Sequence, residues 1–310
     1  MKLDRIAPSA LRVKAHEAIL ASKLCACVYR AGDQRPPERN TAFRTALRLF
    51  CTPAPAEEDF VHAELAATSP EQLYAFAVTS GGTLFLCFRG TSNVSDGIAD
   101  IDLLPRAEVG GGSVHSGFAG RADTVSADYI VDVADRLSLR GGIPTVRRIV
   151  VCGHSLGGAI SGIVALRVKN RLTALGRREQ RDDGLVAASG VVCCAFASPL
   201  FGDDKVRAYI DTHGWTADFV NYIDERDLVP AALRLHDLYL AATNTVSDVA
   251  GSFVSSIEKL AVGKVRVGCV VRGLVASPLT LTLGSTTVVW RVSDHHQRPQ
   301  GRMGWRDGLR

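Results

Sequence analysis

The stretch VVCGHSLGGAISG, residues 150–162, sets a serine between glycines, after an apolar run and before a run of small residues. It fits the pattern G-x-S-x-G, in which the serine occupies a strained turn between a buried strand and a helix. Gly153 and Gly157 flank Ser155, where a side chain would collide with neighbouring backbone. The preceding residues RRIVVC (147–152) suit a buried strand. The pattern therefore predicts that Ser155 is a nucleophile.

The rest of the chain alternates short apolar runs with helical patterns, which is typical of βαβ units on a mostly parallel sheet. Strands are expected at 73–79, 83–90, 147–153, 191–198 and 218–224, the first two as a hairpin. Helices are expected over 11–30, near 117–137 and after Ser155. Residues 265–273 and 285–292 suggest a terminal hairpin. The fold class predicted is α/β, with a mostly parallel central sheet flanked by helices.

Composition is that of an ordinary globular protein, with 310 residues, 46% hydrophobic, 22% charged and a formal net charge of +4. We expect a single domain over 1–310, with an N-terminal helical segment at 1–50 and a basic tail at 298–310. The N-terminus does not resemble a secretory signal, and the long uncharged stretches carry Pro and Gly, so a cytoplasmic location is expected. The cysteines fit reduced core residues rather than a metal site.

Basic residues cluster twice, and neither cluster is interleaved with aromatic residues that could stack on bases, so nucleic-acid binding is not expected. The clusters fit a solvated helix face and tail, with peripheral contact with an anionic membrane as the alternative. They comprise Arg167, Lys169, Arg171, Arg177, Arg178 and Arg181, and then Arg298, Arg302, Arg306 and Arg310.

A nucleophilic serine needs a base and an acid that orients it, which follow the serine in the order acid, then histidine, in α/β-hydrolases. The segment VNYIDERDLVP (220–230) places three carboxylates after a predicted strand, and VSDHHQ (292–297) places His295 and His296 after the last one. His236 is a third candidate for the base. The helix that begins after Ser155 would aim the N–H of Leu156 at a reacting carbonyl oxygen.

An ordered set of motifs narrows the class: LFLCFRGT (84–91), DGIAD (96–100), VHSGF (114–118), GHSLGG (153–158), FASPLFGD (196–203) and VNYIDERDLVP (220–230). Together they resemble the class 3, fungal-type lipase family of α/β-hydrolases, whose members cleave acylglycerols or related esters. The resemblance implies Ser155 as nucleophile, Asp227 as acid and His295 as base, with Thr91 and Leu156 forming the oxyanion hole. It assigns no proton transfer to His115 or His154.

The predicted function is hydrolysis of fatty acyl esters through an acyl-enzyme, with a lipid or other acyl-ester substrate and no metal or organic cofactor. An acyltransferase, thioesterase or phospholipase with the same triad remains an alternative, as does a non-catalytic scaffold. One departure from the family pattern is Ala197, which stands where the family usually has glycine.

Overall fold

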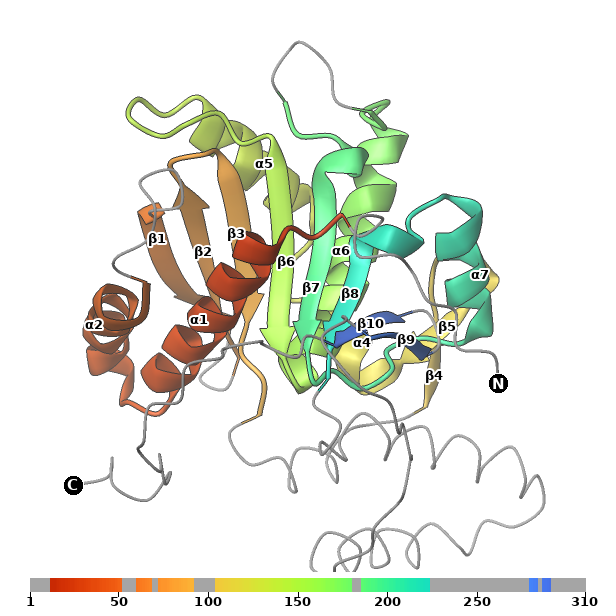
Figure 1. The fold of residues 1–310 in the computed structure, drawn as a ribbon, viewed down its shortest axis with the longest axis horizontal. Helices are drawn as coiled ribbons and strands as arrows, with labels where there is room; N and C mark the ends of the chain where they lie inside the picture. The colour runs from red at the N-terminus through yellow and green to blue at the C-terminus, as the bar shows by residue number, and fades with distance from the viewer. Residues whose placement is uncertain are drawn as a thin grey trace, which may run out of the picture.

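The apolar runs pair into one sheet. The computed structural model describes residues 12–51, 60–68, 72–91, 104–179, 185–223, 279–283 and 286–290. Within these ranges eight strands lie in the order β1-β2-β3-β6-β7-β8-β10-β9 (Figure 1). Their bounds are β1 Phe60–Ala67, β2 Leu73–Thr79, β3 Thr83–Phe88, β6 Arg148–His154, β7 Val191–Phe196, β8 Phe219–Tyr222, β9 Leu279–Leu283 and β10 Thr286–Trp290.

The centre of the sheet is parallel, as the sequence predicts. β3, β6, β7, β8 and β10 run in one direction, whereas β1, β2 and β9 pair antiparallel with their neighbours. The predicted hairpin of β2 and β3 is confirmed. The terminal hairpin differs from the prediction, because the partner of β10 is β9 at 279–283 rather than 265–273, which lies outside the described residues.

Helices cover both faces of the sheet (Figure 1). α1 (Ala15–Gly32) and α2 (Arg39–Cys51) lie on one face, and α4 (Ser116–Ala122), α5 (Ala127–Ser138), α6 (Leu156–Ala174) and α7 (Asp204–Thr212) belong to the other. Successive strand residues alternate between the two cores, as period-2 side chains must. In β7, for example, Cys193 faces the core under α6 and Cys194 the core under α1.

Two features of the helices differ from the sequence expectation. The predicted helix near 117–137 is divided into α4 and α5, because the hydroxyl of Ser126 accepts a hydrogen bond from the N–H of Tyr129 at 3.1 Å and so starts a new helix. Within the predicted helical segment 1–50 the apolar pattern did not give α2 separate bounds, and it did not reveal the edge strand β1. A separate pair, β4 (Pro105–Ala107) and β5 (Ser113–His115), precedes α4.

The first basic cluster is a solvated face only at Arg171 and Arg178, which are exposed, because the other described members are buried or half-buried. Lys169 is fully buried against Asp218, with a 2.7 Å ion pair. Arg167 pairs with Glu108, Arg171 with Asp128, and Arg177 with Asp135. The charges therefore fasten α6 to its neighbours. The basic tail at 298–310 lies outside the described residues, and none of the helices that the structure describes combines the length and apolar character needed to span a bilayer.

Candidate active site

Ser155 occupies a strained turn between β6 and α6. Its backbone has φ 54° and ψ −128°, a region that residues with a Cβ rarely adopt. The N–H of Ser155 donates to the carbonyl of Phe196 at 2.8 Å, and its own carbonyl accepts from Gly158 at 2.8 Å. Such strain persists only where the surroundings enforce it. This geometry is that of a nucleophile elbow, as the G-x-S-x-G pattern predicts.

The flanking glycines are required by close backbone contacts. A Cβ on Gly153 would lie 2.3 Å from the carbonyl of Gly157, and one on Gly157 would lie 2.3 Å from the carbonyl oxygen of Phe88. Real Cβ atoms do not approach so closely, so a side chain at 153 would push the start of α6 away from β6, and one at 157 would push α6 away from β3. A Cβ on Gly157 would also lie 2.9 Å from the N of Gly90. The elbow therefore packs directly on the loop that follows β3.

That loop carries Thr91, whose Oγ1 is buried and has no hydrogen-bond partner among the described residues. A buried hydroxyl without a partner costs on the order of 1–3 kcal/mol, so its presence calls for an explanation. The first N–H groups of α6, that of Leu156 included, have no acceptor within the helix. A substrate oxygen bound beside Ser155 would accept hydrogen bonds from the hydroxyl of Thr91 and from the N–H of Leu156. An oxyanion hole stabilises a negatively charged oxygen in this way.

The C-terminal turn of α1 supports this loop from the opposite face of the sheet. The hydroxyl of Tyr29 lies 3.2 Å from Nδ1 of His154, the residue before Ser155. A Cβ on Gly90 would lie 2.2 Å from that hydroxyl and 2.4 Å from the carbonyl of His154. Arg89 packs over the Tyr29 ring at 5.6 Å and donates to Asp33 at 2.8 Å. α1 thus holds the elbow and the Thr91 loop together.

Burial, followed by the proximity of Cys25, raises the pKa of Tyr29, so the group stays a neutral hydroxyl. A neutral hydroxyl can both accept a hydrogen bond from His154 and donate one. The contact agrees with the structural role expected for His154. His115 likewise packs edge to face on Phe118 at 5.4 Å. The sequence did not indicate Tyr29 or Arg89, because Tyr29 reads as one apolar position of an amphipathic helix.

A second strained residue follows β7. Ala197 has φ 48°, which explains why the family usually has glycine at this position. Its N–H donates to Tyr222 at 2.7 Å. The side chain of Asn221 accepts from the N–H of Ser198 at 3.0 Å and donates to its carbonyl at 2.8 Å. These bonds fix the end of β7. The carbonyl of Phe196, the last residue of β7, accepts the hydrogen bond from the N–H of Ser155.

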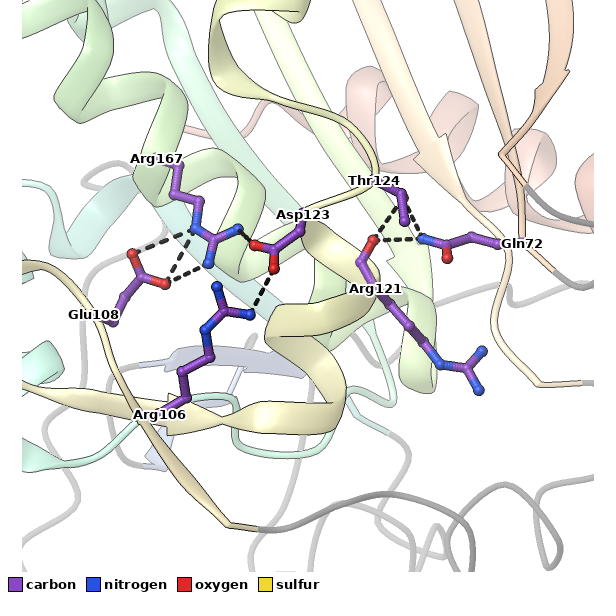
Figure 2. A network of polar contacts seen from close by, with 7 residues as sticks. All are labelled: Gln72, Arg106, Glu108, Arg121, Asp123, Thr124 and Arg167. Atoms are coloured by element: carbon purple, nitrogen blue, oxygen red, sulfur yellow. Dashed lines mark hydrogen bonds and ion pairs between the residues drawn. The ribbon is translucent and has the colours of Figure 1, made fainter.

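A polar network anchors α6 to β4 and α4. Figure 2 shows the guanidinium of Arg167 between Glu108 and Asp123, to which it donates at 2.7 and 2.9 Å. Arg106 donates to the other oxygen of Asp123 at 2.6 Å. Burial opposes the charge of Asp123, but the bonds from Arg106 and Arg167 keep its pKa below the usual value. The network therefore stays charged at neutral pH and fixes the helix that carries Ser155.

Of the predicted site residues the structure describes Ser155, Leu156 and Thr91, and the loop that carries Thr91 packs on the elbow through Gly90. The predicted acid Asp227 and base His295 lie outside the described residues, as do His236 and His296. The strands that precede Asp227 and His295 in the chain are described. β8 ends at Tyr222, β10 ends at Trp290, and the two strands run parallel.

The arrangement of a mostly parallel sheet, helices on both faces and a strained serine between strand and helix defines an α/β-hydrolase fold. The solved structure of M37 lipase has the same fold, with a TM-score of 0.50 and 17% sequence identity over 81% of this chain and 82% of that chain. The fold class predicted from the sequence is confirmed.

Residues 85–235, just under half of the chain, match the family described as "Lipase (class 3)". A lipase of Rhizomucor miehei is 29% identical over 150 residues, which cover 48% of this chain and 37% of the relative. A lipase of Rhizopus niveus is also 29% identical over 150 residues, covering 48% and 34%. The chain thus spans little more than a third of the length of these relatives.

Proposed function

We propose that the protein is a serine ester hydrolase that cleaves fatty acyl esters such as acylglycerols. The observation that carries this proposal is the pairing of Ser155, held at φ 54° by the elbow, with the buried and unpartnered hydroxyl of Thr91 on the adjoining loop. Strain and an unsatisfied polar group both reduce stability, and they coincide where a nucleophile and an oxyanion donor are needed. The relatives, which are lipases, favour the same reaction class.

In the proposed reaction Oγ of Ser155 attacks the ester carbonyl carbon, and the carbonyl oxygen becomes the oxyanion. The N–H of Leu156 and the hydroxyl of Thr91 donate to that oxygen. The base takes the Ser155 proton and returns it to the leaving alcohol. Water then attacks the acyl-enzyme by the same route, releasing the acid and restoring Ser155. No step requires a metal.

We assign the acid to Asp227 and the base to His295, with His296 as the alternative base. Asp227 follows β8 in the chain and His295 follows β10. Because β6, β8 and β10 belong to the parallel part of one sheet, chain leaving these strands departs from the edge at which Ser155 lies. This order, Ser155 then Asp227 then His295, is the order that α/β-hydrolases use.

Contact with an anionic membrane, if it is made by basic residues, is assigned to the tail at 298–310 rather than to α6. Four members of the first basic cluster, on α6 and just after it, already pair with carboxylates: Arg167, Lys169, Arg171 and Arg177. Their charge is therefore largely neutralised within the fold. The tail carries Arg298, Arg302, Arg306 and Arg310. Vesicle binding with and without these arginines tests the assignment.

Hydrolysis is tested with a chain-length series of soluble esters and purified protein. Ser155→Ala should reduce kcat by up to about a millionfold, as for other triad nucleophiles, while the circular dichroism spectrum and Tm are kept. A fluorophosphonate probe should label Ser155 in the wild type. The matched control is Ser161→Ala on the same helix, whose hydroxyl donates to the Gly157 carbonyl at 2.7 Å and faces no reacting atom. Equal turnover in wild type and Ser155→Ala would refute the proposal.

A further inference from the structure

Behind the elbow, on the α1 face of the sheet, cysteines occupy matching positions on three neighbouring parallel strands. Cys87 of β3 pairs in register with Cys152 of β6, and Cys152 with Cys194 of β7. Cys25 of α1 packs onto this row, with its Sγ 3.5 Å from that of Cys87. All four thiols are buried. Cys25 lies outside the segment that matches the lipase family, so the cluster is a property of this chain.

The sulfurs of Cys25, Cys87 and Cys152 lie within 4.8 Å of one another and meet at one point from three elements. With metal–sulfur bonds of about 2.3 Å, as thiolates form with zinc, three sulfurs in a trigonal plane lie about 4.0 Å apart. The observed spacing brackets that value. A single ion at the centre therefore requires only small side-chain shifts.

We propose that Cys25, Cys87 and Cys152 form a trigonal binding site for one soft monovalent cation, Cu(I). The choice of ion follows from the ligand set. Three thiol sulfurs and no carboxylate or imidazole make up the group found among the described residues, and thiolates select soft ions. Zinc prefers four ligands in a tetrahedron, which this group does not offer. Cu(I) accepts the lower coordination number.

The surroundings suit a permanently bound ion rather than an exchanging one. Cys87 and Cys152 are 0% exposed, and Cys25 is 5% exposed beneath its own helix, so the ion would enter while α1 docks on the sheet. Arg89, two residues after Cys87 in the chain, brings a guanidinium that is 8% exposed to the same helix–sheet junction. Its charge is already matched by Asp33, to which it donates at 2.8 Å, so the proposal relies on the sulfur ligands alone.

The test uses the full chain produced in copper-supplemented cells and purified without oxygen, with bound metal measured by mass spectrometry. We expect about one copper per chain, and a sulfur-only shell of three ligands by X-ray absorption. Cys25→Ser and Cys152→Ser should each reduce the copper content to background. Cys193→Ala, which removes a buried thiol from the opposite face of the same sheet, should retain it.

Wild-type chain without copper, or with copper in an oxygen- or nitrogen-containing shell, would overturn the proposal. Retention of copper by Cys25→Ser or Cys152→Ser would do the same. Because a core substitution can impair folding, each variant is compared by circular dichroism and by fluorophosphonate labelling. The absorption spectrum of the wild type needs no variant and decides the ligand set by itself. Zinc bound at one equivalent in place of copper would refute the choice of ion.

Discussion

At the carboxyl edge of the parallel strands, Ser155 is strained and the hydroxyl of Thr91 is buried without a hydrogen-bond partner among the described residues. At the amino edge the buried charges lie beside opposite charges, although Oδ1 of Asp218 makes no hydrogen bond among the described residues and has only the Arg12 guanidinium 3.5 Å away. There Lys169 donates to Asp218 and to the carbonyl of Ala188, each at 2.7 Å, and Arg148 pairs with the buried Glu17. The same sheet therefore has strained or unpartnered polar groups at its carboxyl edge and ion-paired groups at its amino edge.

The difference shows where the fold tolerates a loss of stability. A charge pair at the amino edge is bound to a fixed partner and can do nothing else. The donors at the carboxyl edge are held in place by packing, with the Tyr29 hydroxyl 3.2 Å from His154 and the elbow glycines against the Phe88 carbonyl, and they remain available to a ligand. Substitutions at the amino edge should therefore change stability, and those at the carboxyl edge should change activity.

The largest effect on stability is expected at Lys169. Lys169→Met leaves the buried Asp218 carboxylate with only the half-exposed guanidinium of Arg12, 3.5 Å from its Oδ1, so the free energy of unfolding should fall by up to about 3–5 kcal/mol. The double variant Lys169→Met/Asp218→Asn should lose clearly less than the sum of the two single losses, since neither charge is then left unpaired. Denaturant unfolding of the four proteins measures the coupling. Arg171→Met, on the same helix with an exposed ion pair, should cost below about 1 kcal/mol.

The pH dependence of this pair has a defined sign. Burial raises the pKa of Asp218, with Lys169 opposing, and burial lowers the pKa of Lys169, with Asp218 opposing. Folded Asp218 therefore binds its proton at a higher pH than the unfolded chain, whose Asp has a pKa of about 3.9. The contribution of Asp218 to the free energy of unfolding is therefore fully present below a pH of about 3.9, and it is lost as the pH rises through the pKa of Asp218 in the folded protein. The stability of wild type relative to the double variant should rise from pH 7 to pH 4; a fall would contradict this.

The sequence revealed the parallel sheet because its strands are nearly uniform apolar runs, which local pattern shows directly. It did not reveal β1, whose burial alternates irregularly along an edge, and it did not give separate bounds to α2, which is short and mostly polar outside. Likewise, Lys169 and Arg167 read as solvated charges, since their partners Asp218 and Glu108 are distant in the chain. Contacts between distant segments leave no local periodicity.

The site divides in the same way. Ser155 and Leu156 belong to one contiguous motif, so they followed from the sequence, and Thr91 followed from a second motif that packs on the first. Tyr29 and the Cys25 cluster depend on how α1 docks, and the sequence separations of 125 residues to His154 and 62 residues to Cys87 hide both. The catalytic roles of Ser155, Leu156, Thr91, Asp227 and His295 all stay predictions.

At the carboxyl edge, Thr91→Val should remove an oxyanion donor without a loss of stability. Loss of one such donor typically lowers kcat by about 10²–10³-fold, or about 3 kcal/mol of barrier. Because the hydroxyl has no partner among the described residues, its removal should leave Tm unchanged or slightly higher. Thr91→Ser keeps the hydroxyl and should keep most of kcat. Full activity in Thr91→Val, or a Tm lowered by several degrees, would place Thr91 among the structural residues instead.

The smallest effect is expected at Ala197, which shares the positive φ of Ser155 but has no reacting group to present. A residue with a Cβ costs about 1–2 kcal/mol in the left-handed region. Glycine removes that cost but adds about 0.4–1 kcal/mol of chain entropy on folding. Ala197→Gly should therefore stabilise the protein by up to about 1 kcal/mol, with kcat unchanged, in paired denaturant and ester assays. A loss of stability would mean that the methyl group, 8% exposed and packed at the end of β7, contributes more than its backbone strain costs.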